Sequence, residues 1–185
     1  VAPAYLKSDR LFQIEDDEGN PVVMKDWKQF QQAIKLASES DFSPIVIDTV
    51  DNAWDMCSIF VTGKHGWEHE SDGDYGKGWS LVAKEFKRTI DYLTKQGKGV
   101  IFTSHTKYIE VTEGAVKHTR LDNSLGNAAR KYINGLVDFI FFFTIKDKKR
   151  LIITKPTENL NAKDRSDCLP NIMEMDYGVM KKELT

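Results

Sequence analysis

The sequence has little cysteine, no long apolar run and almost no net charge, and each shortage excludes a class of protein. Its two cysteines, Cys57 and Cys168, lie far apart and lack the spacing of metal ligands, which argues against a disulfide scaffold and favours a reducing cytosol. The longest apolar run, residues 137–145, is interrupted by Asp138 and is too short to span a membrane. The chain has 26 Lys and Arg against 28 Asp and Glu, so its net charge of −2 excludes a generally basic coat for nucleic acid.

The rest of the composition is that of a globular protein. The chain has 185 residues, of which 41% are hydrophobic and 29% charged, and this predicts a single domain over residues 1–185. It begins at Val1 without an initiator Met or the regions of a signal peptide, so we expect a further segment upstream.

Strand-like apolar runs alternate with helical stripes in the first half of the chain. A short strand is predicted at residues 11–14, followed by an acidic turn at residues 15–20. Apolar residues at helical spacing predict helices that begin near Trp27, Val50 and Trp79, with Asp26 as the N-cap of the first. Residues 44–48, an apolar run that ends in an acid, and residues 100–105 are typical of buried parallel strands, and the glycine-rich residues 63–78 predict a long loop.

The second half predicts two hairpins around a short helix. Residues 107–122 are polar and β-prone with a turn at Glu113-Gly114, a helix is expected around residues 125–136, and residues 137–145 are expected to pair with residues 151–154. The remaining tail reads as a loop. This order predicts an α/β fold, with a mainly parallel sheet flanked by helices and a C-terminal β-hairpin.

Asp48 and His105 stand at the predicted carboxyl ends of two parallel strands, where such sheets place their chemistry. Nucleoside triphosphatases use an acid in the position of Asp48 to hold Mg²⁺ beside the phosphates, usually through water. The structural alternative for Asp48 is an N-cap of the following helix. A polar side chain in the position of His105, with Lys107 nearby, can sense a γ-phosphate, whereas the alternative is a histidine hydrogen-bonded at the strand end.

Two further clusters have simple structural explanations, and a third does not. Residues 65–69 match the H-x-x-E-H pattern of zinc proteases, but the surrounding glycines disfavour the helix that this chemistry needs, so a polar loop with Trp67 partly packed is favoured. Residues 146–150 are expected to form a solvated hairpin tip. Lys163 and Arg165, one residue apart in a predicted loop, have no evident packing reason and would suit a phosphate approached from outside.

Together these segments resemble phage RecA-like ATPases, which are AAA-type P-loop NTPases associated with single-strand annealing and homologous recombination. Residues 45–51 are similar to their Walker B strand, and residues 76–79, 100–107, 137–138 and 162–165 follow in the family's order. The resemblance covers residues 43–165 and implies a RecA-like core that binds ATP and Mg²⁺.

The resemblance also implies roles for individual residues. Asp48 would hold the water shell of Mg²⁺, with Thr49 and Ser104 beside the nucleotide, and His105 would be the polar sensor. Lys163 and Arg165 look like the Lys-x-Arg finger that RadA and DnaB relatives insert into a neighbouring subunit's ATP site. A finger that works in trans requires a homo-oligomeric ring or filament.

Residues 63–78 and 108–122 occupy the places of the two DNA-facing loops of RecA. The second would contact single-stranded DNA through basic side chains, namely Lys107, Lys117, His118 and Arg120. A phage protein of this kind would work in the cytoplasm of its bacterial host, without a membrane.

The sequence departs from the family in lacking a G-x-x-x-x-G-K-[S/T] phosphate loop and the family's catalytic Glu, and we expect both to lie upstream of Val1. Two other readings stay open. One is a RadA- or DnaB-like DNA motor, and the other is a non-catalytic binding module with a RecA fold; a zinc hydrolase comes last.

Overall fold

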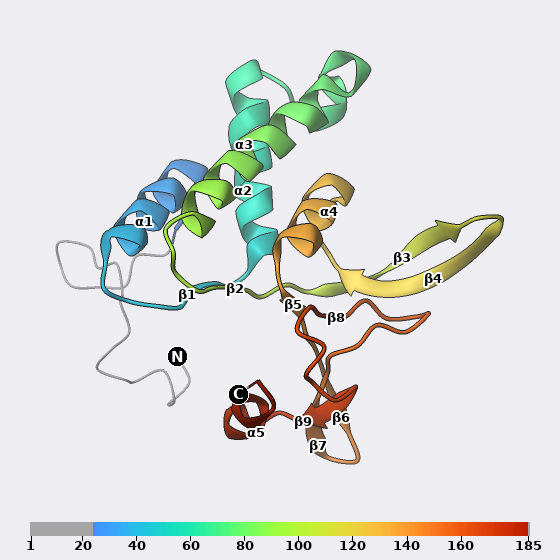
Figure 1. Cartoon of the computed structure of the whole chain (residues 1–185). Helices are drawn as coiled ribbons and strands as arrows, with labels where there is room; N and C mark the ends of the chain where they lie inside the picture. Colours follow the sequence, from blue (N-terminus) through green and yellow to red (C-terminus); the bar gives the residue numbers. More distant parts are fainter. Residues whose placement is uncertain (1–23, 185) are drawn as a thin grey trace. The chain divides into compact units, whose positions relative to one another are not determined.

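The computed structural model describes residues 24–184. The strand and the acidic turn expected between residues 11 and 20 therefore lie outside the described residues. Contacts within the chain divide it into two compact units, the first ending at Ser104 and the second beginning at His105. Each unit has its own helices and strands (Figure 1).

The first unit consists of three helices and a two-stranded parallel sheet. Its elements are α1 (Trp27–Glu39), β1 (Ile45–Ile47), α2 (Val50–His65), α3 (Lys77–Thr94) and β2 (Val100–Phe102). The predicted N-cap of α1 is confirmed, because the Asp26 carboxylate accepts a hydrogen bond of 2.9 Å from the Gln29 backbone amide. Such a cap stabilises a helix by about 1 kcal/mol.

Aromatic side chains from the three helices form the core of the first unit. The rings of Trp27 and Phe86 stack with their centroids 6.2 Å apart, and Trp54 meets Phe86 edge-on at 5.2 Å. The Trp27 indole also donates a hydrogen bond of 3.1 Å to Glu85 Oε1. Trp27 and Phe86 are at most 1% exposed and Trp54 is 7% exposed, so the apolar stripes predicted for α1, α2 and α3 are confirmed as largely buried faces. Trp79, expected on the buried stripe of α3, is the exception, since it is 44% exposed.

The predicted parallel pairing of the two apolar runs is confirmed, although each strand has only three residues. Ile45 lies opposite Val100, and Ile47 lies opposite Phe102. The expectation that both faces of these strands are buried is wrong, since Val46 is 55% and Ile101 48% exposed.

A mainly parallel sheet, as expected from the sequence, is not seen. Within residues 24–184, β1 and β2 are the only named strands that pair in parallel, and the other pairs form small antiparallel sheets. The reason is the length of the connections. A parallel pair needs a crossover of a dozen residues or more, as α2 and α3 provide, whereas most later strands follow one another closely.

The glycine-rich stretch at residues 63–78 is not the long loop that was expected. Helix α2 continues through Gly63 to His65 and ends at Gly66, whose φ of 69° is left-handed. Two short 3₁₀ helices follow, η2 (Glu70–Asp72) and η3 (Asp74–Gly76). The buried Glu70 accepts a 2.5 Å hydrogen bond from the Ser58 hydroxyl of α2, which ties the segment to that helix.

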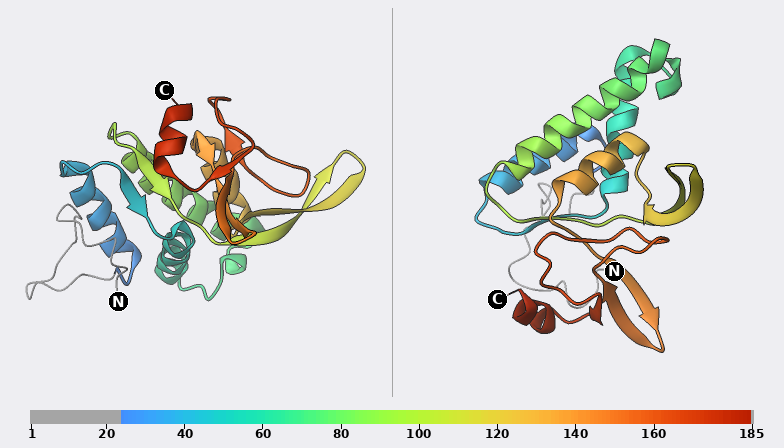
Figure 2. Two further views of the ribbon diagram at one scale, coloured as in Figure 1. Left: turned by 90° about the horizontal axis from the view of Figure 1, so that it is seen from below. Right: turned by 45° about the vertical axis from the view of Figure 1, so that its right-hand side comes forward.

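The second unit begins with the predicted hairpin, a curved two-stranded ribbon in Figure 2. It consists of β3 (Thr106–Glu113) and β4 (Val116–Asn123), and helix α4 (Asn127–Leu136) follows. The hairpin turn contains Gly114, whose φ of 62° explains the glycine.

The C-terminal hairpin is also confirmed, with a first strand that is shorter than predicted. Its elements are β6 (Phe142–Lys146) and β7 (Lys149–Ile153), joined by a two-residue turn in which Asp147 and Lys148 both have positive φ. The strand expected over residues 137–145 is interrupted at Phe141, because β5 (Phe139–Ile140) pairs with a different strand, β8 (Lys163–Asp164).

The tail is more regular than expected. Strand β9 (Ile172–Glu174) pairs with β7, and helix α5 (Tyr177–Glu183) follows it. Ile152, Leu169 and Met173 form the buried centre of this part. In the described part of the chain, no helix is long and apolar enough to cross a membrane.

Candidate functional site

The carboxyl ends of β1 and β2 bring Asp48 and Thr103 together. Backbone bonds continue past the strands, from the Thr103 amide to the Ile47 carbonyl at 3.0 Å and from the Val50 amide to the Thr103 carbonyl at 2.9 Å. The Thr103 hydroxyl then donates a hydrogen bond of 2.6 Å to Asp48 Oδ1. This bond orients the exposed Asp48 carboxylate, whose Oδ2 accepts no hydrogen bond from any residue in 24–184.

A second bonded pair lies one residue further along the segment after β2 and three residues further along the segment after β1. The Ser104 hydroxyl donates a hydrogen bond of 3.0 Å to Asp51 Oδ1 in the first turn of α2. The N-cap of α2 is Thr49, whose hydroxyl accepts from the Asn52 amide, so the alternative role of Asp48 as a helix cap is wrong. Sequence reasoning assigned no role to Asp51 or Thr103, although both stand within three residues of an assigned residue.

These two pairs supply the kind of ligand that Mg²⁺ accepts. The ion binds hard oxygen ligands and keeps several waters, so it is held by one or two carboxylates rather than by a closed cage. Asp48 is exposed, and one of its carboxylate oxygens has no partner among residues 24–184, which leaves room for a hydrated ion. The residues present therefore fit a water-mediated Mg²⁺ site.

His105, the expected sensor, is the first residue of the second unit. Its backbone carbonyl accepts a hydrogen bond of 2.8 Å from the Ser124 amide, which links the start of β3 to the end of β4. Asp48 belongs to the first unit, so a joint site of Asp48 and His105 stays a prediction.

Lys163 has a structural partner that the sequence did not indicate. Its Nζ donates hydrogen bonds to the backbone carbonyls of Asn134 at 2.9 Å and Val137 at 2.6 Å, at the carboxyl end of α4. Burial lowers the pKa of Lys163, and the nearby positive charge of Arg165 lowers it further. The expectation that Lys163 has no packing reason is wrong, since it satisfies carbonyls that a helix end leaves unpaired.

Arg165 binds the same junction between α4 and β5. Its guanidinium lies 2.6 Å from Asp138 Oδ1 and 3.4 Å from the Gly135 carbonyl oxygen. Both charged side chains are more than half exposed, at 56% for Arg165 and 63% for Asp138. An exposed ion pair of this kind contributes only about 0–1 kcal/mol, so Arg165 can exchange Asp138 for another anion at little cost.

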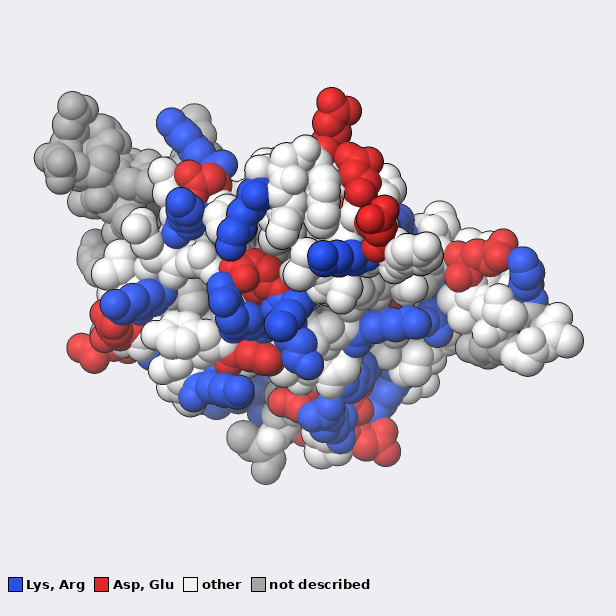
Figure 3. All heavy atoms as spheres, turned by 90° about the horizontal axis from the view of Figure 1, so that it is seen from above, with Lys and Arg blue, Asp and Glu red and all other residues white. Residues whose placement is uncertain are grey.

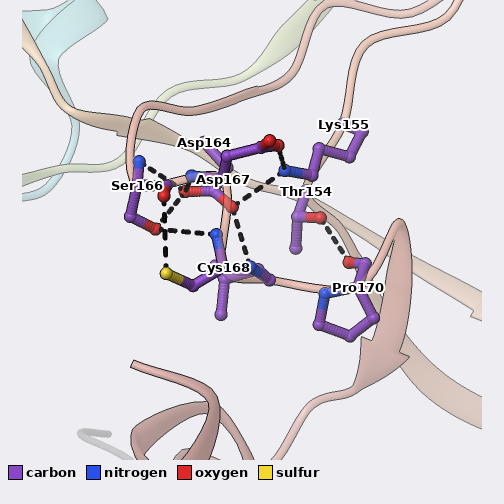
Figure 4. A network of polar contacts seen from close by, with 8 residues as sticks. Thr154, Lys155, Asp164, Ser166, Asp167, Cys168 and Pro170 are labelled. Atoms are coloured by element: carbon purple, nitrogen blue, oxygen red, sulfur yellow. Dashed lines mark hydrogen bonds and ion pairs between the residues drawn. The ribbon is translucent and has the colours of Figure 1, made fainter. Parts of the chain in front are cut away.

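The residue between the two cations, Asp164, organises the loop that follows β8 (Figure 4). One carboxylate oxygen accepts hydrogen bonds from the Ser166 hydroxyl at 2.6 Å and the Ser166 amide at 2.9 Å. The other accepts from the Leu169 amide at 2.9 Å and from Lys155 Nζ at 3.1 Å. Lys155 also pairs with Asp167.

Asp164 is strongly acidic in this setting. Burial of the carboxyl raises its pKa, but the hydrogen bonds from Ser166, Leu169 and Lys155 and the charge of Lys155 outweigh burial and lower the pKa to about 2. The side chain is 0% exposed, and the Asp167 amide also donates a hydrogen bond of 3.2 Å to the charged carboxylate.

The β3–β4 hairpin divides the four expected DNA contacts between its two faces. Cross-strand neighbours share a face, and Lys107 lies opposite Asp122, Val111 opposite His118, and Ile109 opposite Arg120. Lys107, His118 and Arg120 therefore share one face, and Lys117 lies on the other.

The acidic and basic side chains of this hairpin balance in number, and two of the four expected DNA contacts lie beside acids. Lys117 Nζ lies 3.1 Å from Glu110 Oε1, and Arg120 lies 3.8 Å from Asp122 Oδ2. Over residues 106–123, three Lys and Arg face three Asp and Glu.

At the base of the hairpin, the buried Asp122 is the centre of a hydrogen-bond network, which we call the Asp122 hub, and the sequence did not predict it. Its Oδ1 accepts hydrogen bonds from the side-chain amides of Asn123 at 3.2 Å, Asn134 at 3.3 Å and Asn161 at 2.9 Å. The hub joins β4 to α4 and to the segment before β8. No local pattern indicated it, because the three asparagines are spread over 39 residues.

The zinc-protease pattern does not form a metal site. His65 is the last residue of α2 and stacks on Trp67, whereas His69 begins η2 and meets Trp79 edge-on. The left-handed Gly66 ends the helix between the two histidines, which keeps them off a common helical face. Among residues 24–184, no group of three or more His, Cys, Asp or Glu could hold a metal ion.

Comparison with known proteins agrees with the chemistry at the ends of β1 and β2. The family model described as AAA domain matches residues 3–166, which is most of the chain. No curated protein and no solved structure matches the sequence. With an NTPase-like carboxylate at a parallel strand end and a family match of this length, the chain belongs to the AAA domain family of P-loop NTPases.

Proposed function

We propose that this chain is the core of a RecA-like ATPase that acts on single-stranded DNA during recombination or annealing, as the phage ATPases it resembles do. The AAA domain family indicates nucleotide binding and hydrolysis, usually with Mg²⁺. The observation that carries the proposal is the pair of hydroxyl–carboxylate contacts, Thr103 with Asp48 and Ser104 with Asp51, at adjacent strand ends.

In this proposal each residue of the pairs has a definite task. Asp48 holds the water shell of Mg²⁺ through its free oxygen, and Thr103 fixes the direction of the carboxylate. Ser104 and Thr49 lie beside the nucleotide, and His105 senses the γ-phosphate. When bound, ATP would supply the phosphoanhydride bond that is broken, and Mg²⁺ would neutralise the negative charge of the phosphates.

The assembly and the DNA contacts complete the proposal. The chain works as a homo-oligomeric ring or filament, in which Arg165 leaves Asp138 and reaches the ATP site of a neighbouring subunit, while Lys163 supports the adjoining end of α4. Single-stranded DNA contacts the β3–β4 hairpin through Lys107, Lys117, His118 and Arg120.

Mg²⁺-dependent nucleotide binding is the direct test. We expect Asp48→Asn to lose at least about tenfold of the affinity that Mg²⁺ adds for a fluorescent ATP analogue, because the neutral amide cannot hold the ion's water shell. Asp41→Asn is the matched control, since Asp41 is an exposed acid with the same charge and lies outside the site. Binding is measured by fluorescence titration with Mg²⁺ and with EDTA.

The result also separates the alternatives. Equal Mg²⁺ dependence in Asp48→Asn and wild type would remove Asp48 from the metal site. Absence of nucleotide binding by the full-length wild-type protein would contradict the proposed function and favour the non-catalytic binding module.

A further inference from the structure

We infer that the exposed face of α3 is a second surface for the backbone of single-stranded DNA, separate from the β3–β4 hairpin. This inference rests on the proposed function, because it assumes that the protein acts on single-stranded DNA. The surface consists of Lys77, Lys84, Arg88 and Lys95, and we call it the α3 basic stripe.

The spacing of these four residues aligns them. They are separated by seven, four and seven residues, which at 100° per residue places all four within about 40° of one another on the helix. The buried residues of α3, such as Val82, Phe86 and Leu93, lie on the opposite side. The stripe is about 27 Å long, since each residue adds about 1.5 Å along the axis.

The positive charge of the stripe is largely unpaired. Lys77, Lys84 and Lys95 are exposed and have no ion-pair partner among residues 24–184. Arg88 pairs with Glu85 at 2.7 Å but keeps a side chain that is 72% exposed. Glu85 is also engaged by Trp27 and Gln31, so its charge is shared among three donors.

The α3 basic stripe lies in a segment whose net charge is opposite in sign to that of the whole chain. Residues 77–95 contain five Lys and Arg but two Asp and Glu, a local net charge of +3 in a chain whose net charge is −2. The cations Lys117 and Arg120 of the β3–β4 hairpin, in contrast, face their own acids. Figure 3 shows many Lys and Arg side chains on one face, with acidic side chains between them.

Single-stranded DNA fits this surface because it combines a flexible, negatively charged backbone with unpaired nucleobases. Unpaired lysines bind phosphates and release condensed counterions, which makes the affinity dependent on salt. Tyr92 is 43% exposed and lies four residues after Arg88 and three before Lys95, beside the stripe. An exposed aromatic ring next to cations offers a stacking surface to an unpaired base, which favours a single strand over a duplex.

The test replaces the unpaired lysines. The triple variant Lys77→Gln, Lys84→Gln and Lys95→Gln is compared with the control Lys28→Gln, Lys35→Gln and Lys64→Gln, which changes three exposed lysines on α1 and α2. Both variants lose the same charge, and glutamine is a good helix former, so both should fold. Binding of a 30-nucleotide oligo-dT and of a 30-base-pair duplex is measured by fluorescence anisotropy from 50 to 200 mM salt.

We expect the stripe variant to bind oligo-dT at least tenfold more weakly at 100 mM salt, with a log–log salt slope smaller by about 2, while the control stays near wild type. Equal losses in the two variants would overturn the inference, because the effect would then come from net charge alone. A loss of duplex binding only, or of binding to anionic phosphatidylserine vesicles only, would also overturn it. If wild type itself did not bind oligo-dT, the DNA part of the proposed function would fail with it.

Discussion

Asp164 orders the loop after β8 because one carboxylate accepts hydrogen bonds from several donors at once. Its partners include backbone amides of residues 166, 167 and 169, which otherwise have no helix or sheet to bond with. Asp122 has a similar task at the base of the β3–β4 hairpin, where it gathers three asparagine amides. In both cases removal of one acceptor breaks several hydrogen bonds at once, and each such bond contributes about 0.5–1.5 kcal/mol.

We predict that the stability of the protein falls in acid in a way that depends on Asp164. The folded pKa of this carboxyl is about 2, below its ordinary value of 3.8, so the charged form stabilises the fold. The contribution is fully present above about pH 4 and is lost as the pH falls towards 2, at about 1–2 kcal/mol. Urea unfolding midpoints between pH 5 and 2 measure it.

Asp164→Asn should be less stable at pH 7 and should lose less of its remaining stability between pH 4 and 2. Asp167→Asn is the control, because Asp167 is 92% exposed and its positive φ of 57° suits asparagine. An identical acid response in Asp164→Asn and wild type would contradict the assignment.

At the scale of elements, the connection between α2 and α3 depends on one glycine contact. A Cβ on Gly78 would lie 2.1 Å from the backbone oxygen of Glu70, so η2 approaches the start of α3 too closely for any side chain. This contact, with the Ser58–Glu70 hydrogen bond, explains why the glycine-rich stretch is structured. The glycines were expected to indicate a loop, whereas Gly78 allows the backbone of η2 to pack closely against α3.

We predict that Gly78→Ala destabilises the protein by at least about 2 kcal/mol, because backbone must move to admit the methyl group. Thermal unfolding followed by circular dichroism measures the change. Gly63→Ala is the matched substitution, since a Cβ there meets nothing within 4 Å and the residue lies inside α2. It should stabilise the protein by about 0.5–1 kcal/mol, and equal effects of the two substitutions would refute the packing argument.

At the scale of the whole molecule, Arg165 links this chain to its assembly in our proposal. The Arg165–Asp138 ion pair is exposed and forms within a single subunit. Lys163, by contrast, is committed to the end of α4 through two carbonyl oxygens. The two cations of the predicted finger therefore have different tasks: Lys163 supports the fold, and Arg165 is available.

We predict that Arg165→Ala abolishes ATP turnover by assemblies and leaves ATP binding by one subunit nearly intact, because the side chain acts on a neighbour's site. Steady-state phosphate release and nucleotide titration measure the two quantities. Asp138→Asn serves as a control, since it frees Arg165 without removing it and should retain turnover. Normal turnover by Arg165→Ala would show that the trans-finger assignment is wrong.

Features that depend on residues close together in the sequence could be predicted, and features that depend on distant residues could not. Asp26 as a cap, the turn at Gly114 and the apolar stripe of α3 were predictable, since each depends on residues a few positions apart. The pairing of β1 with β2 followed from two apolar runs of matching type. The Thr103–Asp48 contact was not assigned, because it depends on the register of those strands.

The sequence by itself determined helices α1 to α4, the two hairpins and the acid after β1, because periodicity, capping and turn geometry are local properties of the chain. The tertiary structure alone decided which cations are available. Lys163 donates hydrogen bonds to backbone carbonyls at the end of α4, 26–29 residues away. Lys117 and Arg120 pair with acidic side chains of their own hairpin. The three lysines of the α3 basic stripe, in contrast, are exposed. A charge acts through the groups that surround it in space, and those come from parts of the chain that no local pattern connects.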